Sequence, residues 1–429
     1  MNMMTPTSNL KTAFSEFTAM EYLMIDVASN FGLSKKNWDT RINWTQDNMD
    51  ELMEISMMTD VKDTLVKEAK EPALFYAGIM ALAAARQGKP TGYPISLDAT
   101  ASGMQLLSVL IGCEKSAAIC NVIPSTEFSD DREDAYVNLY NTMCTKVDNP
   151  ADVSAADAKD SIMTALYGSQ AVPKQHFGEG SMLEAFYATL QDALPGVWSL
   201  NCLLKQLWQD DALSHDWIMP DNFHVHIKEM NKIQKQVRFM DKPATVDITV
   251  NQGSIEGRSL GANVTHSVDG LVVREMRGRC DYDINTVMNL FQLCSRAEGG
   301  EKFEGTVNRA KDDMVNTIWQ NYKDSGFLSI RILDNLDEQN FCLIDFKVLR
   351  DLLVSLPDVP FKILTIHDCF RCLPSYGNDL RRQYNQILSD ISSSEMLSYI
   401  TTQITGQYIP ITKISDISAD ILQSDYSLS

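Results

Sequence analysis

Apolar residues recur at intervals of three and four over residues 10–90, and this periodicity predicts a series of helices. The stretch TGYPISLDATASG at 91–103 departs from it, because proline does not fit a helix interior and YPISL alternates like a strand that ends at Asp98. A further helix is expected after Gly103. Residues 131–212 are again helical in pattern. Alternating or β-branched residues then predict strands at 223–227, 235–240 and 244–250.

The remaining part of the chain predicts mixed helices over 284–355, broken at a Gly-Gly pair, and then two strands. FKILTI at 361–366 is expected to be a buried strand that ends at His367 and Asp368, and FRCLP to continue as the second strand of a hairpin. The longest apolar run, ALFYAGIMALAAA, has 13 residues. A membrane-spanning helix needs roughly 18. The pattern therefore predicts an α/β (α+β) fold that is mostly helical, with a small sheet and no membrane span.

The chain has 429 residues, 44% of them hydrophobic, so it is long enough for two to three domains or one large enzyme. Its formal net charge of −20 repels phosphates and, taken alone, argues against a nucleic-acid enzyme. A local basic strip is the exception; it contains Lys232, Lys235, Arg238 and Lys242. DNA binding would explain this strip. A solvated strand edge protected by lysines also explains it and, on charge alone, is the commoner case.

Cysteine usage and the chain start bear on the cellular compartment. Nine cysteines, an odd number scattered along the chain, fit a reducing environment. The first residues show neither a secretory nor an Arg-rich targeting pattern. Cys369 and Cys372 lack a second pair at zinc-binding spacing and are interpreted as core residues. We therefore expect a cytoplasmic protein.

Three segments carry residues of catalytic type. DATASGMQ follows the strand ending at Asp98, and LTIHDCFRCLP sets Asp368 between two strands. AKDSIMTALYGS spaces three side chains by four residues, so they share one helix face: Lys159, Met163 and Tyr167. Each segment alone has an ordinary explanation, since an aspartate after a strand is usually a turn or cap residue and the third segment is also an amphipathic helix capped near Gly168.

Together these segments resemble phage-type single-subunit RNA polymerases. DATASGMQ is similar to polymerase motif A, AKDSIMTALYGS to motif B and LTIHDCFRCLP to motif C. NVTHSVDG at 263–270 resembles the segment whose histidine lies near the nucleotide ribose, and ADILQSDYSLS at 419–429 resembles the C-terminal foot of that family. NVIPS at 121–125 and DAYVNLY at 134–140 are also similar to the family just after motif A. The segments follow the order of the family.

The resemblance implies a right-hand polymerase that adds ribonucleotides to a growing RNA. Asp98, Asp368 and the carbonyl of Ala99 would hold two Mg²⁺ ions, and Lys159 would bind the triphosphate and is a candidate to protonate the departing pyrophosphate. The nucleotide-binding residues would be Gly103, Tyr167, Gly168 and His266. Gly103 would leave room for a ribose 2′-hydroxyl where related DNA polymerases carry a glutamate; a tight turn is the simpler explanation. The family usually has an arginine at the position of Ala155.

The resemblance also implies a division of the chain. Residues 1–130 would form the first part of the palm, 131–265 the fingers with a β-hairpin like the family's specificity loop, and 266–429 the second part of the palm. An insertion is expected around 280–350, either as a docking surface or as a neutral elaboration. The family's N-terminal domain and thumb are expected to be lacking, as in two-polypeptide phage RNA polymerases.

The expected partners are a DNA template, the RNA product, ribonucleoside triphosphates and a second, smaller subunit that supplies the N-terminal and thumb portion. A single-stranded-DNA-binding accessory factor is a further candidate partner. The chain would transcribe phage genes in the cytoplasm of a bacterial host. Two alternatives stay open: a DNA polymerase of the same superfamily, and a polymerase-like structural or regulatory subunit without catalytic activity. A glycosidase with paired carboxylates would not explain the segment from Lys159 to Tyr167.

Overall fold

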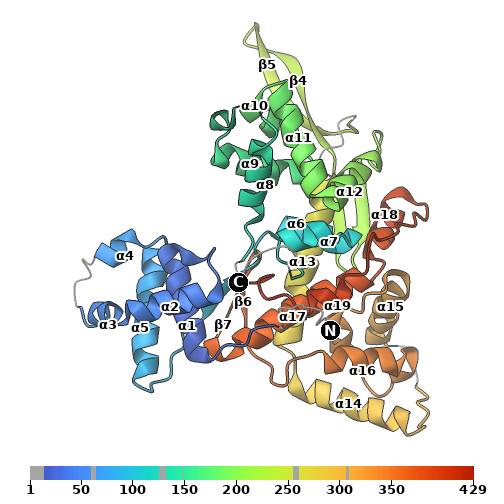
Figure 1. Cartoon of the computed structure of the whole chain (residues 1–429). Helices are drawn as coiled ribbons and strands as arrows, with labels where there is room; N and C mark the ends of the chain where they lie inside the picture. The colour runs from blue at the N-terminus through green and yellow to red at the C-terminus, as the bar shows by residue number, and fades with distance from the viewer. Residues whose placement is uncertain (1–13, 59–63, 125–131, 148, 255–259, 306–308) are drawn as a thin grey trace, which may run out of the picture.

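The structure is a computed structural model that describes residues 14–58, 64–124, 132–147, 149–254, 260–305 and 309–429. Most of the start of the chain, Ser125 of the NVIPS stretch and residues 306–308 of the expected insertion lie outside the described residues. Figure 1 shows three groups of elements around a centre that contains α13 (Leu260–Cys280) and α17 (Gly377–Ser393). The fold is mostly helical with small antiparallel sheets, as the sequence predicts.

Helices alone form the first group, drawn in blue in Figure 1. Its α-helices are α1 (Ala19–Ala28), α2 (Trp38–Asp47), α3 (Met49–Ser56), α4 (Thr64–Glu68) and α5 (Pro72–Arg86). α1 begins at a capping box in which Thr18 accepts from the Glu21 amide and Glu21 accepts from the Thr18 amide. The helix series predicted for this part of the chain is confirmed.

The second group extends upward in Figure 1 and ends in a β-hairpin. Its helices are α8 (Ala135–Cys144), α9 (Ala155–Leu166), α10 (Ala171–Phe177), α11 (Ser181–Ala193) and α12 (Pro195–Gln206). Its strands are β2 (Ser214–Ile218), β3 (His224–Lys228), β4 (Met230–Phe239) and β5 (Lys242–Asn251). The periodicity did not indicate β2, which pairs with β3.

The centre holds a three-stranded antiparallel sheet in the order β1-β7-β6, made of β1 (Ile95–Asp98), β6 (Leu364–Ile366) and β7 (Cys369–Cys372). The other helices between the groups are α6 (Ser102–Ile111), α7 (Glu114–Ile119), α18 (Met396–Thr405), which packs against β2, and α19 (Ser418–Ile421). The strand predicted to end at Asp98 is confirmed. The following helix begins at Ser102, so that Gly103 lies in its first turn rather than before it.

The prediction of a buried strand at 361–366 is wrong. The strand covers only Leu364–Ile366, and its apolar side chains are solvent-exposed, Leu364 by 59% and Ile366 by 54%. The physical reason is position: β6 is the edge strand and pairs with β7 alone. A run of apolar residues indicates a strand but does not tell whether its faces are covered.

The third group has a hydrophobic core of its own, separate from the main core. It comprises α14 (Ile284–Glu298), α15 (Ala310–Ser325) and α16 (Phe346–Val354), with 3₁₀ turns at Ile330–Asp334 and Phe341–Leu343. Its core includes Leu290, Ile318 and Leu349. The main core instead joins the first two groups and the centre through residues such as Tyr22, Phe186 and Leu428.

A buried ion-pair network attaches the third group to the centre. Arg279 on α13 donates through Nε to Glu275 at 3.1 Å and through Nη1 to Asp390 of α17 at 2.6 Å. Glu275 also accepts from the amide of Ile330 at 3.2 Å. Because both Arg279 and Glu275 are buried, loss of either partner would leave an uncompensated charge in the protein interior.

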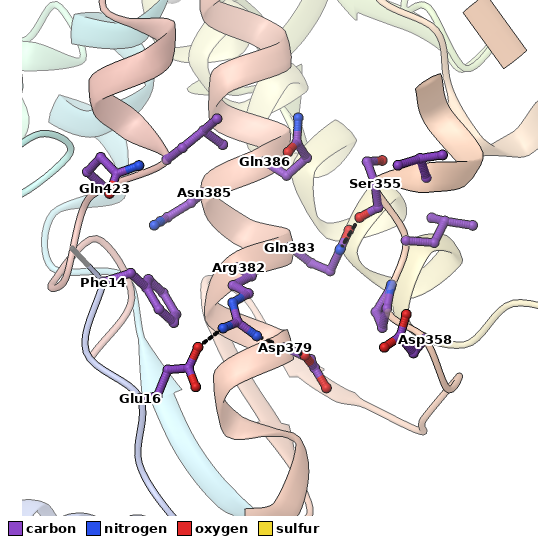
Figure 2. A pocket seen from close by; sticks show the side chains of 14 residues that line it. Phe14, Glu16, Ser355, Asp358, Asp379, Arg382, Gln383, Asn385, Gln386 and Gln423 are labelled. Atoms are coloured by element: carbon purple, nitrogen blue, oxygen red, sulfur yellow. Dashed lines mark hydrogen bonds and ion pairs between the residues drawn. The ribbon is translucent and has the colours of Figure 1, made fainter. Parts of the chain in front are cut away.

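A second attachment lies beside a cavity of about 570 Å³ (Figure 2). There the side-chain amide of Gln383 on α17 donates to the carbonyl of Ser355, the residue after α16, at 2.5 Å. Arg382 of the same helix pairs with Glu16 of the chain start and with Asp379, three residues earlier on α17, and all three residues line the cavity. The chain start, α17 and the end of the third group therefore meet at one place.

Asp26 of α1 holds β1 in position and makes the stability of this region depend on pH. Asp26 is 1% exposed, and its carboxylate accepts hydrogen bonds from the amide of Ser96 at 2.8 Å, the hydroxyl of Tyr93 at 2.7 Å and the side-chain amide of Asn30 at 2.8 Å. Burial raises the pKa of Asp26 to about 6, although these hydrogen bonds act in the opposite direction.

We expect Asp26→Asn to weaken the pH dependence of unfolding between about pH 4 and pH 6. In that interval folded Asp26 keeps a proton that the unfolded chain releases, so its contribution to stability is complete below the unfolded pKa of 3.8 and is lost as the pH rises through about 6. Linkage sets its size at roughly 3 kcal/mol. Urea unfolding of both proteins across this interval measures the effect. Parallel pH profiles would contradict the assignment.

Among the helices that the structure describes, none combines the length and the apolar character needed to cross a membrane.

Candidate functional site

Asp98 and Asp368 lie at the ends of neighbouring strands. Asp98 is the last residue of β1 and is opposite Cys369, the first residue of β7. Asp368 immediately precedes Cys369, in the turn between β6 and β7, and its carbonyl accepts a hydrogen bond from the amide of Ala99 at 3.2 Å. His367, the other residue of this turn, adopts a left-handed conformation with φ of 55°. The hairpin tip predicted for His367 and Asp368 is confirmed.

The two carboxylates affect each other electrostatically. Partial removal of the Asp98 carboxyl from water raises its pKa to about 6, and the negative charge of Asp368 acts in the same direction. A divalent cation would relieve this repulsion, and carboxylate oxygens are hard ligands of the kind that Mg²⁺ prefers. The pair therefore fits a magnesium site. Within the described part of the chain, no group of three or more His, Cys, Asp or Glu residues is arranged to hold a metal ion, so other oxygen ligands would have to complete the coordination.

A cavity of about 180 Å³ adjoins Asp368 and gathers residues from four segments of the chain. Its lining includes Gly103 of α6, Tyr167 at the end of α9, His266 of α13 and Asp368. The rings of Tyr167 and His266 stack with their centroids 5.1 Å apart and an interplanar angle of 13°. Four residues singled out in the sequence thus meet around one small space.

Gly103 is in close contact with Tyr167. A Cβ atom at position 103 would lie 2.4 Å from the Tyr167 hydroxyl and 3.0 Å from the ring carbon that bears it. The first distance is far below van der Waals contact, and the second is shorter than an ordinary contact. The absence of a side chain at Gly103 therefore lets Tyr167 take up its position, a relation between the two residues that their sequence positions do not indicate.

Lys159 and Gly168 do not line the cavity. The Nζ atom of Lys159 lies 5.3 Å from the ring centroid of Tyr136 on α8, within the range of a cation–π contact. Gly168 follows the C-cap residue Tyr167 with a φ of 89°, the left-handed conformation in which glycine commonly ends a helix. Ala155, at the first position of α9, contributes no charge.

Asp269 is a cavity residue that the sequence analysis missed. It lies on α13 three residues after His266, and also lines the cavity together with Thr265 and His367. Burial raises the pKa of the Asp269 carboxyl, and the nearby charge of Asp368 adds to the effect. The spacing could have predicted this position, because residues three apart on a helix share a face and His266 was already a candidate site residue.

The last residues of the chain form a strap along Asp98. The amide of Ser429 donates to the carbonyl of Asp98 at 2.9 Å, and the amide of Thr100 donates to the carbonyl of Ser427 at 3.4 Å. The buried side-chain amide of Gln105 on α6 donates to the Ser427 carbonyl at 2.9 Å and to Thr100 Oγ1 at 2.9 Å. These bonds hold the turn after Asp98 in one conformation. Gln105 carried no signal in the sequence.

The basic strip lies on the β4–β5 hairpin, which stands away from the body of the molecule (Figure 1). Its tip, Met240 and Asp241, adopts positive φ angles of 47° and 59°. Facing residues of the two strands point to the same side. Lys232 and Arg238 therefore share the face that carries Thr249 and Pro243. Lys235 and Lys242 share the other face with their partners Val246 and Phe239. The strip is thus divided between a polar and a largely apolar face.

Residues 15–179 match the family model of DNA-dependent RNA polymerase. The matched segment contains Asp98, Gly103, Lys159 and Tyr167, and ends before His266 and Asp368. This segment is therefore similar to the DNA-dependent RNA polymerase family.

Two curated relatives agree with the family match. One is a "Probable DNA-directed RNA polymerase" of Neurospora crassa, 30% identical over 119 residues, which are 27% of this chain and 13% of the relative. The other is the "DNA-directed RNA polymerase" of Pseudomonas phage phiKMV, 30% identical over 109 residues, which are 24% of this chain and 13% of the relative. Each alignment thus spans a small part of a much longer protein.

Proposed function

We propose that this chain is the catalytic subunit of a phage-type DNA-directed RNA polymerase and that it transfers ribonucleotides in a template-directed, two-metal reaction. The observation that carries the proposal is the cavity that joins Gly103, Tyr167 and His266 to Asp368. These residues span a long stretch of sequence, and both the matched family segment and the unmatched remainder contribute to the cavity. A turn aspartate or an amphipathic helix would not account for this convergence.

The metal ligands in this proposal are Asp98, Asp368 and the carbonyl of Ala99, which together would hold two Mg²⁺ ions. When bound, the ions activate the attacking hydroxyl and neutralise charge on the leaving pyrophosphate. Lys159 binds the phosphates of the incoming nucleotide from α9. The pair Asp98 and Asp368 supplies negative charge for the cations at the point where β1 and the β6–β7 turn meet.

Tyr167 and His266 position the ribose in this proposal. Their stacked rings form one wall of the cavity, and Asp368 lies on the same cavity. Gly103 contributes in two ways, because it leaves space beside the sugar and lets the Tyr167 hydroxyl approach α6. Gly168 follows the C-cap residue Tyr167 and ends α9 with a left-handed conformation, which helps to set the position of the Tyr167 side chain.

Extension of a primed DNA template with magnesium tests the proposal. Ribonucleotide incorporation is the expected result, with deoxyribonucleotides used at a much lower rate. Preferential use of deoxyribonucleotides would instead favour the DNA polymerase alternative. Absence of both activities, in the chain alone and in a complex with co-purified proteins, would favour a polymerase-like subunit without catalysis.

The β4–β5 hairpin is proposed to contact template DNA through its polar face. Residues 230–251 contain four basic and two acidic side chains, a net charge of +2 in a chain of −20. We expect Lys232→Ala combined with Arg238→Ala to weaken DNA binding and to lower the slope of log K against log salt by about two, since each lost phosphate contact removes about one.

The matched control for this prediction is Lys235→Ala combined with Lys242→Ala, which removes the same charge from the other face. Fluorescence anisotropy with labelled DNA at several salt concentrations measures both pairs. Equal losses in the two double variants would show that only total charge matters, and no loss in either would remove the hairpin from the DNA interface.

A second, smaller subunit, a single-stranded-DNA-binding factor and a bacterial host cytoplasm stay predictions from the family resemblance. The separate core of the third group makes it a self-contained unit on which a partner could dock. Co-purification of the tagged chain, followed by transcription assays on duplex and pre-melted DNA, tests the partner prediction directly.

A further inference from the structure

The candidate site contains more acidic than basic side chains close to the metal ligands. Asp98, Asp368 and Asp269 lie in or beside it, whereas Lys159 is a single cation on α9 and Ala155 adds none. A phosphate-bearing substrate requires further positive charge at such a place. Arg132 is a cation whose charge acts on Asp98, and its surroundings distinguish it from an ordinary surface arginine.

Hydrogen bonds fix the backbone next to Arg132 relative to Asp98. The side chain of Asn121 donates to the carbonyl of Glu133 at 2.9 Å and accepts from the amide of Glu133 at 2.9 Å. The same Asn121 amide donates to Thr100 Oγ1 at 3.3 Å, two residues beyond Asp98. The backbone next to Arg132 is therefore linked through Asn121 to the turn that follows β1.

The guanidinium of Arg132 is not fully satisfied by the protein. Its Nε atom is buried and has no hydrogen-bond partner within the described residues. The nearby Asp134 is committed elsewhere: it pairs with Lys35 at 2.5 Å and caps α8 through the amide of Tyr136 at 3.2 Å. A buried donor without a partner is costly, and a phosphate oxygen is a strong acceptor for a guanidinium.

Lys159 contacts the same helix start. Its Nζ atom lies 5.3 Å from the ring centroid of Tyr136, in the first turn of α8, and Arg132 lies just before that turn. The charge of Asp368 acts on Tyr136 and that of Asp98 on Arg132. The beginning of α8 therefore lies next to two cations, Lys159 and Arg132, and within electrostatic range of both candidate metal ligands.

We propose that Arg132 binds a substrate phosphate beside Asp98, either of the incoming nucleoside triphosphate or of the primer strand. This inference rests on the proposed polymerase function and assigns to Arg132 the phosphate contact that Ala155 does not provide. The guanidinium satisfies its buried donor with a phosphate oxygen, and the phosphate gains a neutralising charge next to the acidic pair.

The test compares Arg132→Ala and Arg132→Lys with Arg350→Ala, a control that removes a partly exposed arginine, paired with Glu298, from the third group. Primer extension gives KM for the nucleotide, and anisotropy gives Kd for the primed template. We expect Arg132→Ala to raise one of these constants about 10- to 100-fold, the range of a lost charge-assisted hydrogen bond. A raised nucleotide KM identifies the triphosphate as the source, and a raised template Kd identifies the primer strand. Arg132→Lys should recover part of the loss.

A second readout does not depend on polymerase activity. Inorganic tripolyphosphate and, separately, a short single-stranded oligonucleotide should raise the thermal unfolding midpoint of the wild-type chain, and Arg132→Ala should abolish the shift caused by one of them. Unchanged KM, Kd and midpoint shifts in a folded Arg132→Ala protein would overturn the inference. A wild-type chain that binds phosphate through Arg132 but extends no primer, either alone or in a complex with co-purified proteins, would contradict the proposed function and leave the inference standing.

Discussion

Asp98→Asn and Asp368→Asn are each expected to reduce ribonucleotide incorporation on a primed template at least about a thousandfold, because a metal ion supplies several kcal/mol of transition-state stabilisation and each 1.4 kcal/mol corresponds to a factor of about ten. Asparagine keeps the size of the side chain but removes the charge that holds a cation. Asp98 ends β1 opposite Cys369, the residue that follows Asp368, so the loss of either carboxylate should disable the same centre.

The stability of these variants separates a catalytic role from a structural one. Asp98 and Asp368 repel each other, which contributes to the raised pKa of Asp98. Removing one charge should therefore leave the unfolding midpoint unchanged or raise it. Asp47→Asn, at an exposed position on α2, provides a control with the same chemical change. Incorporation at the wild-type rate in either site variant would refute the assignment, and a large fall in the midpoint would point to a structural role.

The sequence predicted the site best where a candidate catalytic residue lies at the end of a strand. The strand ending at Asp98 and the hairpin tip at Asp368 were readable because proline, alternation and short apolar runs mark such ends. The pairing of Asp98 with Cys369 was not readable from pattern alone. Strand order depends on contacts between distant segments, and only the resemblance to polymerases suggested that these two carboxylates meet.

Features that depend on packing between distant segments could not be predicted from the sequence. The exposure of Leu364 and Ile366 follows from the edge position of β6, and an apolar run looks the same at an edge or in the middle of a sheet. Gln105 holds the C-terminal strap through tertiary hydrogen bonds that no spacing reveals. The division of the basic strip between two faces was available from the two-residue period of a strand, once the register of β4 against β5 was known.

Gly103→Ala is the second substitution with a large expected effect, because the new Cβ atom would lie 2.4 Å from the Tyr167 hydroxyl. Tyr167 would have to move, and with it the ring stacked on His266. We expect kcat/KM for ribonucleotides to fall about 10- to 100-fold, since displacement of a positioning group by about 1 Å can cost a factor of about a hundred. Single-nucleotide extension kinetics measure the change.

Gly103 has two possible roles, which a second substitution distinguishes: it lets Tyr167 take up its position, or it leaves space for the ribose 2′-hydroxyl. If Tyr167 is displaced, Tyr167→Phe should partly rescue Gly103→Ala, because it removes the closest atom and leaves a ring carbon at 3.0 Å. A double-mutant cycle normalised to Tyr167→Phe alone gives the coupling between the two positions. If Gly103 acts only by leaving space beside the 2′-hydroxyl, the effects should add, and Gly103→Ala should impair ribonucleotides while sparing deoxyribonucleotides. Strong coupling with equal losses for both sugars would show that Gly103 acts through the position of Tyr167.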